Sequence, residues 1–199
     1  MSNPRFLTQE QKVQSRATAL KEKLCRWCGL DVHRLSKKRR TFCSDECVHE
    51  FNIRSSASYI RIYIAKRDKY ICQICGLDCK GFVRQLWRYV NDHIQELQKN
   101  PVYAGHNNYR HAMKVLQVEF FDLHNMEWVN THGRSTFYDI DHIHEVIKGG
   151  GQCGEENLRL LCLACHRKET ARLRAELKKA NSAASDSAFP QAPESPSSA

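Results

Sequence analysis

The sequence has no long apolar run. No stretch approaches the roughly 18 consecutive apolar residues of a membrane-spanning helix, and the first residues show no charged-then-apolar leader of the secretory type. A chain of 199 residues also has room for only one medium domain or two small ones. We therefore expect an intracellular protein without a membrane partner, and we exclude a large multidomain machine.

Acidic residues are scarce relative to basic ones. The chain has 31 Lys and Arg against 22 Asp and Glu, a formal net charge of +9. The last twenty residues contain two acids, Asp186 and Glu194, and no Lys or Arg, so residues 1–179 carry +11. The same tail is rich in Ala, Ser and Pro, which predicts disorder over residues 180–199. This positive charge suits a polyanionic partner such as DNA.

Cysteine is abundant, with ten residues in the chain. Disulfides are not expected in a reducing compartment, which leaves metal binding or reactivity. Because two close cysteine pairs can complete one tetrahedral zinc site, four pairs predict two structural zinc ions. The pairs are Cys25 and Cys28, Cys43 and Cys47, Cys72 and Cys75, and Cys162 and Cys165.

The first pair of each set lies in the same local sequence. Residues 25–31 read Cys-Arg-Trp-Cys-Gly-Leu-Asp and residues 72–78 read Cys-Gln-Ile-Cys-Gly-Leu-Asp, the pattern of a zinc knuckle. The partner pairs begin helices instead, with Ser44 as a candidate cap. A knuckle followed by a helix start is typical of a treble-clef zinc site. Two alternatives stay open: scattered free thiols, and an ion shared between pairs of different sets.

Hydrophobic periodicity and turn residues predict a mostly helical chain with two short strands near its end. The expected helices cover residues 48–68, 81–100, 108–123 and 164–179, after a weak helical tendency over 9–23. The expected strands cover residues 137–143 and 157–161, with a short extended segment at Tyr70 and Ile71. The second zinc set must therefore close across an insert, residues 82–131, which we expect to pack as a helical cap.

Polar side chains stand at the ends of the two predicted strands. Asp141 and His142 end the first strand, Asn157 begins the second, and His166 follows the last paired cysteine. A helix packed across a hairpin can bring these positions together. Asp141 and His166 can then hold one divalent ion with open positions for water and phosphate. His142 can act as a general base because imidazole titrates near neutral pH.

Several of these residues also have plainer interpretations. Asp141 and His142 can form an ordinary hydrogen-bonded pair at a strand end, and His166 can replace a cysteine on zinc. His144 is a second candidate base, although simple exposure explains it as well. The basic run at 37–40 suits a nuclear-import signal or a phosphate contact, while a solvated loop is the simpler interpretation.

These motifs resemble the HNH endonuclease family, also called the ββα-metal fold. Its zinc-stabilised branch shows C-x-x-C, D-H-I, G-G, N-L and L-C-x-x-C-H in this order. The matching segments here are residues 72–75, 141–143, 149–150, 157–158 and 161–166. The preceding zinc segment and the Gly-Gly-Gly-Gln-Cys stretch resemble in particular the HNH module of zinc-finger Ran-binding-domain annealing helicases. The chain is too short to hold a helicase motor as well.

The resemblance implies a small α+β fold, with a treble-clef zinc module ahead of a ββα-metal domain. It implies that His142 activates water for attack on a phosphodiester, and that Asp141 and His166 bind Mg²⁺ or Mn²⁺. It implies that Asn157 orients His142 or its loop. Basic residues on the helix of His166 would contact DNA, namely Arg167, Lys168, Arg172 and Arg174.

We therefore expect a metal-dependent DNA endonuclease with two structural zinc ions and one catalytic ion. Its substrate is expected to be branched or fork-like DNA, its partners helicase or replication-fork factors, and its location the nucleus in a eukaryote. An RNA nuclease and a non-catalytic zinc module that binds nucleic acid or protein stay open as alternatives. The expected segments are a flexible basic start at 1–24, a zinc module at 25–50, an HNH domain at 51–179 and a disordered tail at 180–199.

Overall fold

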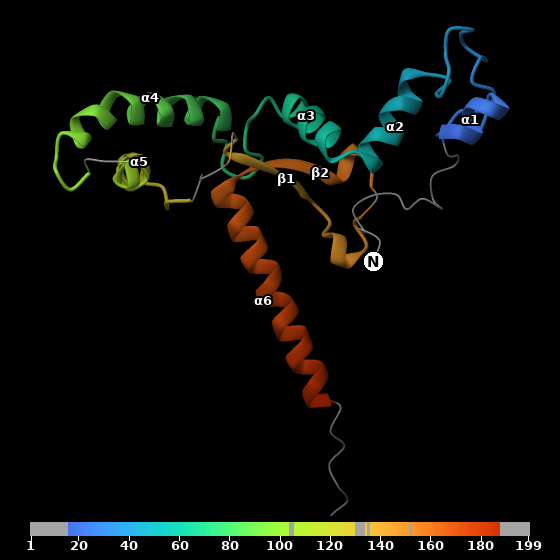
Figure 1. The fold of residues 1–199 in the computed structure, drawn as a ribbon. Helices are drawn as coiled ribbons and strands as arrows, with labels where there is room; N and C mark the ends of the chain where they lie inside the picture. Colours follow the sequence, from blue (N-terminus) through green and yellow to red (C-terminus); the bar gives the residue numbers. More distant parts are fainter. Residues whose placement is uncertain (1–15, 104–105, 130–133, 135, 152, 188–199) are drawn as a thin grey trace, which may run out of the picture.

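The computed structural model describes residues 16–103, 106–129, 134, 136–151 and 153–187 (Figure 1). Among the described helices, none combines the length and apolar character that crossing a bilayer requires. The helices are α1 (Arg16–Glu22), α2 (Asp45–Ser55), α3 (Ala57–Arg67), α4 (Cys79–Gln98), α5 (His106–Leu123) and α6 (Leu163–Ser187). The strands are β1 (Tyr138–His142) and β2 (Leu158–Cys162), with 3-10 turns η1 (Val146–Lys148) and η2 (Glu155–Asn157) between them.

The single helix expected over 48–68 is wrong, because Ser56 divides it into α2 and α3. Ser56 has an extended backbone, with φ −130° and ψ 107°, and its hydroxyl accepts a hydrogen bond from the Tyr59 amide at 3.3 Å. A serine side chain that caps the next helix competes with continuation of the first one. The zinc module and the rest of the chain therefore meet at a bend.

Two further boundaries differ from expectation. Tyr70 is not extended. It and the preceding Lys69 form a left-handed turn, with φ 61° at Tyr70 and 53° at Lys69. Only Ile71 pairs, in an isolated β-bridge with Asp78. Helix α6 continues to Ser187, eight residues beyond the expected end, since alanine-rich sequence without Gly or Pro sustains a helix. The remaining part of the expected tail, 188–199, and residues 1–15 lie outside the described residues.

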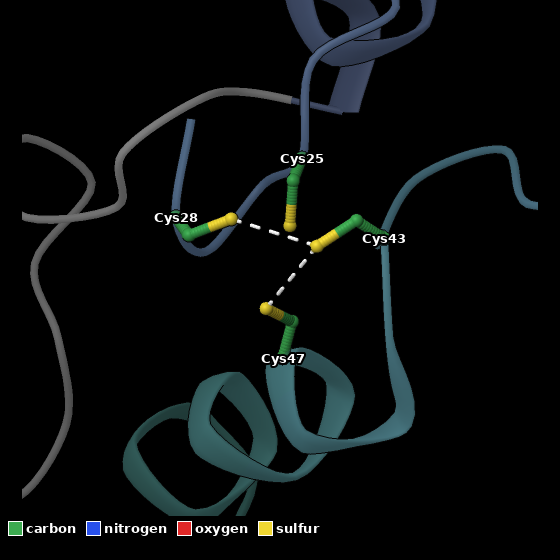
Figure 2. A group of neighbouring side chains, drawn as sticks. All are labelled: Cys25, Cys28, Cys43 and Cys47. Carbon is green, nitrogen blue, oxygen red and sulfur yellow. Dashed lines mark hydrogen bonds between the residues drawn. The ribbon is translucent and has the colours of Figure 1, made fainter. Parts of the chain in front are cut away.

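The first zinc module brings Cys25, Cys28, Cys43 and Cys47 together. Their ligand atoms lie within 4.8 Å of one another, and Figure 2 shows the four sulfurs pointing toward a common centre. The Cys43 sulfur lies 3.6 Å from that of Cys28 and 3.5 Å from that of Cys47. Ser44 caps α2 as predicted, since its hydroxyl accepts a hydrogen bond from the Cys47 amide at 3.2 Å. Four converging thiols are the donor set that structural zinc requires.

Backbone amides help this module to present thiolates. Burial of the Cys25 thiol favours its neutral form, but N–H groups of Cys28, Cys43 and Trp27 donate to the sulfur and lower its pKa to about 6, below the ordinary value of 9.0. Zinc binds the thiolate and not the thiol. The fold thus prepares Cys25 for a metal ion.

The second cluster consists of Cys72, Cys75, Cys162 and Cys165, whose ligand atoms also lie within 4.8 Å of one another. It joins positions 87 residues apart, with the sulfurs of Cys75 and Cys162 separated by 3.8 Å. Each cluster is complete within its own set, so the alternative of an ion shared between the sets is wrong. His166 belongs to neither cluster, which also removes its alternative role as a zinc ligand.

The helical insert forms one core with the second zinc cluster. Phe82 of α4 packs against Phe120 and Phe121 of α5, and its ring centroid lies 4.6 Å from that of Phe137, just before β1. Cys72 and Cys162 belong to the same buried cluster. Figure 1 shows α4 and α5 on one side of the sheet, with α6 leaving it in another direction. The expectation of two helices in this insert is confirmed.

The two strands form an antiparallel sheet whose register sets the site. Asp141 lies opposite Arg159, and His142 lies opposite Leu158. Because successive side chains of a strand alternate between faces, Asp139 and Asp141 share one face while His142 shares the other with Ile140. Ile140 packs with Ile64 of α3, so this second face is anchored in the core.

We expect the substitution Cys75→Ser to remove one zinc ion and to unfold the domain that contains it. A structural zinc ion contributes on the order of 10 kcal/mol to the folding of small zinc modules. The measurement is zinc content per chain together with thermal unfolding, and we expect two ions in the wild type and one in the variant.

The matched control is Cys153→Ser, which removes a thiol outside both clusters. This control should keep two zinc ions. A folded Cys75→Ser protein that retained two ions would contradict the zinc assignment.

Candidate active site

Three of the predicted site residues meet where two hollows of the surface join. A cleft of about 770 Å³ opens between β1, the turn after it and α6. A groove of about 300 Å³ runs beside β1 and α3. Asp141, His142 and His166 line both of them. The structure thus brings together residues that lie up to 25 positions apart in the sequence.

The Asp141 carboxylate is held by the opposite strand. Arg159 donates to its Oδ2 from Nε at 3.2 Å and from Nη2 at 3.0 Å. The same Nη2 also lies 3.2 Å from Oε2 of Glu169 on α6. Both contacts to Asp141 use Oδ2, so neither of them involves Oδ1. A paired carboxylate in a half-buried position keeps a defined orientation.

His166 lies in the first turn of α6 and faces a second aspartate. Its Nδ1 is 3.8 Å from Oδ2 of Asp139. Asp139 also accepts from Arg61 at 3.2 Å and from Arg134 at 2.8 Å. A carboxylate beside one ring nitrogen favours a proton there, which leaves the lone pair on Nε2 for a ligand.

Asp139 was missed by sequence reasoning. The available signal was its position two residues before Asp141, which places both carboxylates on one face of the strand. The contact with His166 required knowledge of how α6 crosses the sheet.

Asn157 fastens the loop that follows His142. Its Oδ1 accepts from the His144 amide at 2.6 Å, and its Nδ2 donates to the carbonyls of His144 and Gly150 at 3.0 and 2.9 Å. Gly150 is required by this close approach, because a Cβ there would lie 1.9 Å from the His144 carbonyl oxygen. These bonds place Asn157 on the loop and support the expectation that it orients the segment after His142.

The imidazole of His144 takes part in the same loop. Its Nε2 lies 2.7 Å from the Lys148 carbonyl oxygen, and the residue is exposed. The structure places it outside both hollows lined by His142. This arrangement favours exposure, and not a second base, as the explanation of His144.

Arg172 has different partners from those that the sequence suggested. Its guanidinium donates to Glu145 at 3.1 Å, to Glu169 at 3.2 Å and also to Glu176. Hydrogen bonds that Arg172 donates to these carboxylates raise its pKa above the ordinary value. Arg172 therefore fastens α6 to the turn after β1, and its contact with DNA stays a prediction. Arg167, Lys168 and Arg174 are exposed on α6.

Asp141 and His166 form a candidate centre of a different kind from the zinc clusters. Among the described residues, three or more possible ligand atoms gather within 4.8 Å only in the two cysteine clusters. Mg²⁺ commonly binds one or two carboxylates and keeps several water molecules. An oxygen of Asp141 and a nitrogen of His166 suit a divalent ion that leaves positions for water and phosphate oxygen.

Comparison with known proteins identifies the segment that carries this site. The model of the HNH endonuclease family matches residues 130–172. The chain is 33% identical to the human "DNA annealing helicase and endonuclease ZRANB3" over 131 residues, 66% of this chain and 11% of that protein. It is 30% identical to the protein of the same name from Bos taurus over 154 residues, 74% of this chain and 13% of that protein.

A solved structure, that of the human ZRANB3 HNH domain, is 23% identical and covers 63% of this chain and 97% of its own, with a TM-score of 0.37. The chain thus spans only 11% to 13% of the length of these curated relatives. The segment matched by the family model holds Asp141, His142, Asn157 and His166. Residues 130–172 of the chain therefore form an HNH endonuclease domain, and the chain is homologous to the HNH module of these annealing helicases.

Proposed function

We propose that this protein is a metal-dependent endonuclease that hydrolyses phosphodiester bonds of DNA. The observation that carries the proposal is the meeting of Asp141, His142 and His166 at the junction of the cleft and the groove. The match to the HNH family supports the reaction class. The name of the relatives, DNA annealing helicase and endonuclease, supports DNA as the substrate.

In this proposal, His142 takes a proton from the attacking water. It lies at the end of β1, and Asn157 braces the chain that follows through its bonds to His144 and Gly150. A general base must stay within hydrogen-bond reach of the proton it removes. A fixed loop serves this purpose better than a mobile one.

Asp141 Oδ1 and His166 Nε2 would hold a Mg²⁺ or Mn²⁺ ion. Bound there, the ion supplies positive charge that stabilises the phosphorane-like transition state and the leaving 3′ oxygen. Arg159 orients Asp141 through Oδ2, and Asp139 lies beside Nδ1 of His166. Both are outer partners of the kind that fix metal ligands in direction and tautomer.

The two cysteine clusters would have a structural role only. Four thiolates saturate a tetrahedral zinc ion and leave no position for water, whereas a hydrolytic ion needs an open one. We assign zinc to the cysteine clusters and the chemistry to the separate centre at Asp141 and His166.

One observation favours the alternative of a non-catalytic zinc module that binds nucleic acid. The Asp141 carboxylate already pairs with Arg159, which is the arrangement of a structural ion pair. The two functions differ in whether the protein cuts DNA, and the experiment below separates them.

The finer features of the function follow from the relatives. We propose branched or fork-like DNA as the substrate, a helicase or another replication-fork factor as the partner, and the nucleus as the location in a eukaryote. These proposals rest on the resemblance of the motifs to the HNH module of annealing helicases. The name of the relatives, of which the chain spans 11% to 13%, gives only DNA annealing helicase and endonuclease.

We expect His142→Ala to abolish nicking of supercoiled plasmid DNA in the presence of Mg²⁺ or Mn²⁺. The loss of a general base costs roughly 10²-fold to 10⁴-fold in rate. Binding to the same DNA should persist, because the substitution removes no positive charge. The measurements are gel-based nicking and a binding titration.

The control is His93→Ala, which removes an exposed histidine from α4, outside both hollows. Equal nicking by His142→Ala and the wild type would contradict the nuclease proposal. A parallel assay with RNA distinguishes a DNA nuclease from an RNA nuclease.

We expect Asp139→Asn to raise the metal concentration required for half-maximal nicking. Loss of a carboxylate beside a metal-binding histidine typically weakens metal affinity by about 10-fold to 100-fold. The rate at saturating metal should change much less than the half-saturating concentration. The control is Asp122→Asn, an exposed acid at the end of α5. A lower rate at every metal concentration, with an unchanged midpoint, would contradict the positioning role.

A further inference from the structure

Helix α4 carries a row of basic side chains that the proposed chemistry does not use. Lys80, Arg84 and Arg88 are four residues apart and exposed. Their spacing places them on one face of the helix, away from the buried face that contains Phe82 and Leu86. We call Lys80, Arg84 and Arg88 the α4 stripe.

The α4 stripe lacks the internal partners that occupy other arginines of this protein. Among the described residues, none of its three side chains forms a salt bridge, and Lys80 instead lies 5.0 Å from the centre of the Tyr70 ring. Arg172, by comparison, contacts three carboxylates. At the same four-residue spacing, α4 continues with the exposed acids Asp92 and Glu96, of which Glu96 pairs with Lys99, while Asn91 and Gln95 beside them are exposed and uncharged. The stripe therefore presents net positive charge to solvent.

The dimensions of the α4 stripe suit one nucleic-acid strand. Eight residues of α-helix rise about 12 Å. One strand of a duplex carries a phosphate about every 3.4 Å along the axis, so this length corresponds to three or four successive phosphates. Exposed Lys and Arg side chains bind phosphates without reading the base sequence.

The α4 stripe is connected to the proposed cleavage site through the start of β1. Lys80 and Arg84 line a small cavity of about 220 Å³ together with Thr136. Arg61 of α3 reaches Thr136 Oγ1 at 3.4 Å and Asp139 at 3.2 Å. Asp139 in turn faces His166, so a row of adjacent residues leads from α4 to the site.

The position of the α4 stripe relative to the site is set by packing. Phe82 and Leu86, on the buried face of the same helix, belong to the core that also contains the second zinc cluster and Phe137. Figure 1 shows α4 and α6 leaving the sheet in different directions. The charges of the α4 stripe and those of α6 therefore extend from the sheet along different lines.

We propose that the α4 stripe binds the phosphate backbone of the DNA substrate and holds it on the side of the scissile bond away from α6. This inference rests on the proposed function, because it takes His142 as the position of the cut. In this proposal the helical insert contributes a DNA-binding surface.

The experiment measures binding of a 30-base-pair duplex, at several salt concentrations, by the full chain carrying His142→Ala to prevent cutting. We expect addition of Arg84→Gln and Arg88→Gln to weaken binding on the order of tenfold and to lower the salt slope by about 1.8, since each lost phosphate contact removes about 0.9. The control carries Lys99→Gln and Arg110→Gln, which also remove two positive charges from the insert. Lys99 follows the end of α4 and Arg110 lies in α5, so both are distant in sequence from the α4 stripe. Unchanged zinc content verifies that each variant is folded.

An affinity and salt slope equal to those of the control would overturn the role of the α4 stripe. Nicking by otherwise wild-type protein, measured separately, tests the proposed function. If the α4 substitutions weaken binding but the protein does not nick DNA, the α4 surface is confirmed and the nuclease proposal is wrong. If the protein nicks DNA but the α4 substitutions leave binding unchanged, the nuclease proposal stands and the role of the α4 stripe is wrong. Absence of duplex binding by the His142→Ala protein would overturn both.

Discussion

The second cysteine cluster is the contact on which the domain depends. It joins Cys72 and Cys75 to Cys162 and Cys165, and so brings the residues before the helical insert against the end of β2 and the start of α6. Its buried cysteines share a core with Phe82 and Phe137. His166 immediately follows the last of these cysteines, and its position on α6 is therefore set by the second cysteine cluster.

The two-stranded sheet supplies the other half of the geometry. Its register places Arg159 opposite Asp141, while the alternation of side chains places Asp139 on the face crossed by α6. The ion pairs continue from Arg159 through Glu169 to Arg172, which holds α6 to the turn after β1. Much of the positive charge near the cleft is thus used inside the protein, and the charge on α4 has no such partner among the described residues.

Local sequence patterns specify which chemical groups this protein contains and roughly where its helices and strands lie. Cysteine pairing, the order of Asp141, His142, Asn157 and His166, and the periodicity of the insert are local patterns, and they predicted the zinc clusters, the family and most helices and strands correctly. The break at Ser56 was also present in the sequence as a capping serine, but the surrounding apolar pattern concealed it, because periodicity detects a continuous face and not the change of helix axis.

The packing of the folded chain determines which of these groups lie close together. The partition of the cysteines into two complete clusters depends on a contact across 87 residues, and spacing along the chain does not specify such a contact. The carboxylate partners of Arg172, the approach of Asp139 to His166 and the path from α4 to β1 all depend on how α4 and α6 pack against the sheet. The identity and order of the side chains can be read from short stretches of sequence, whereas the distances between them are set by the packing of the whole domain.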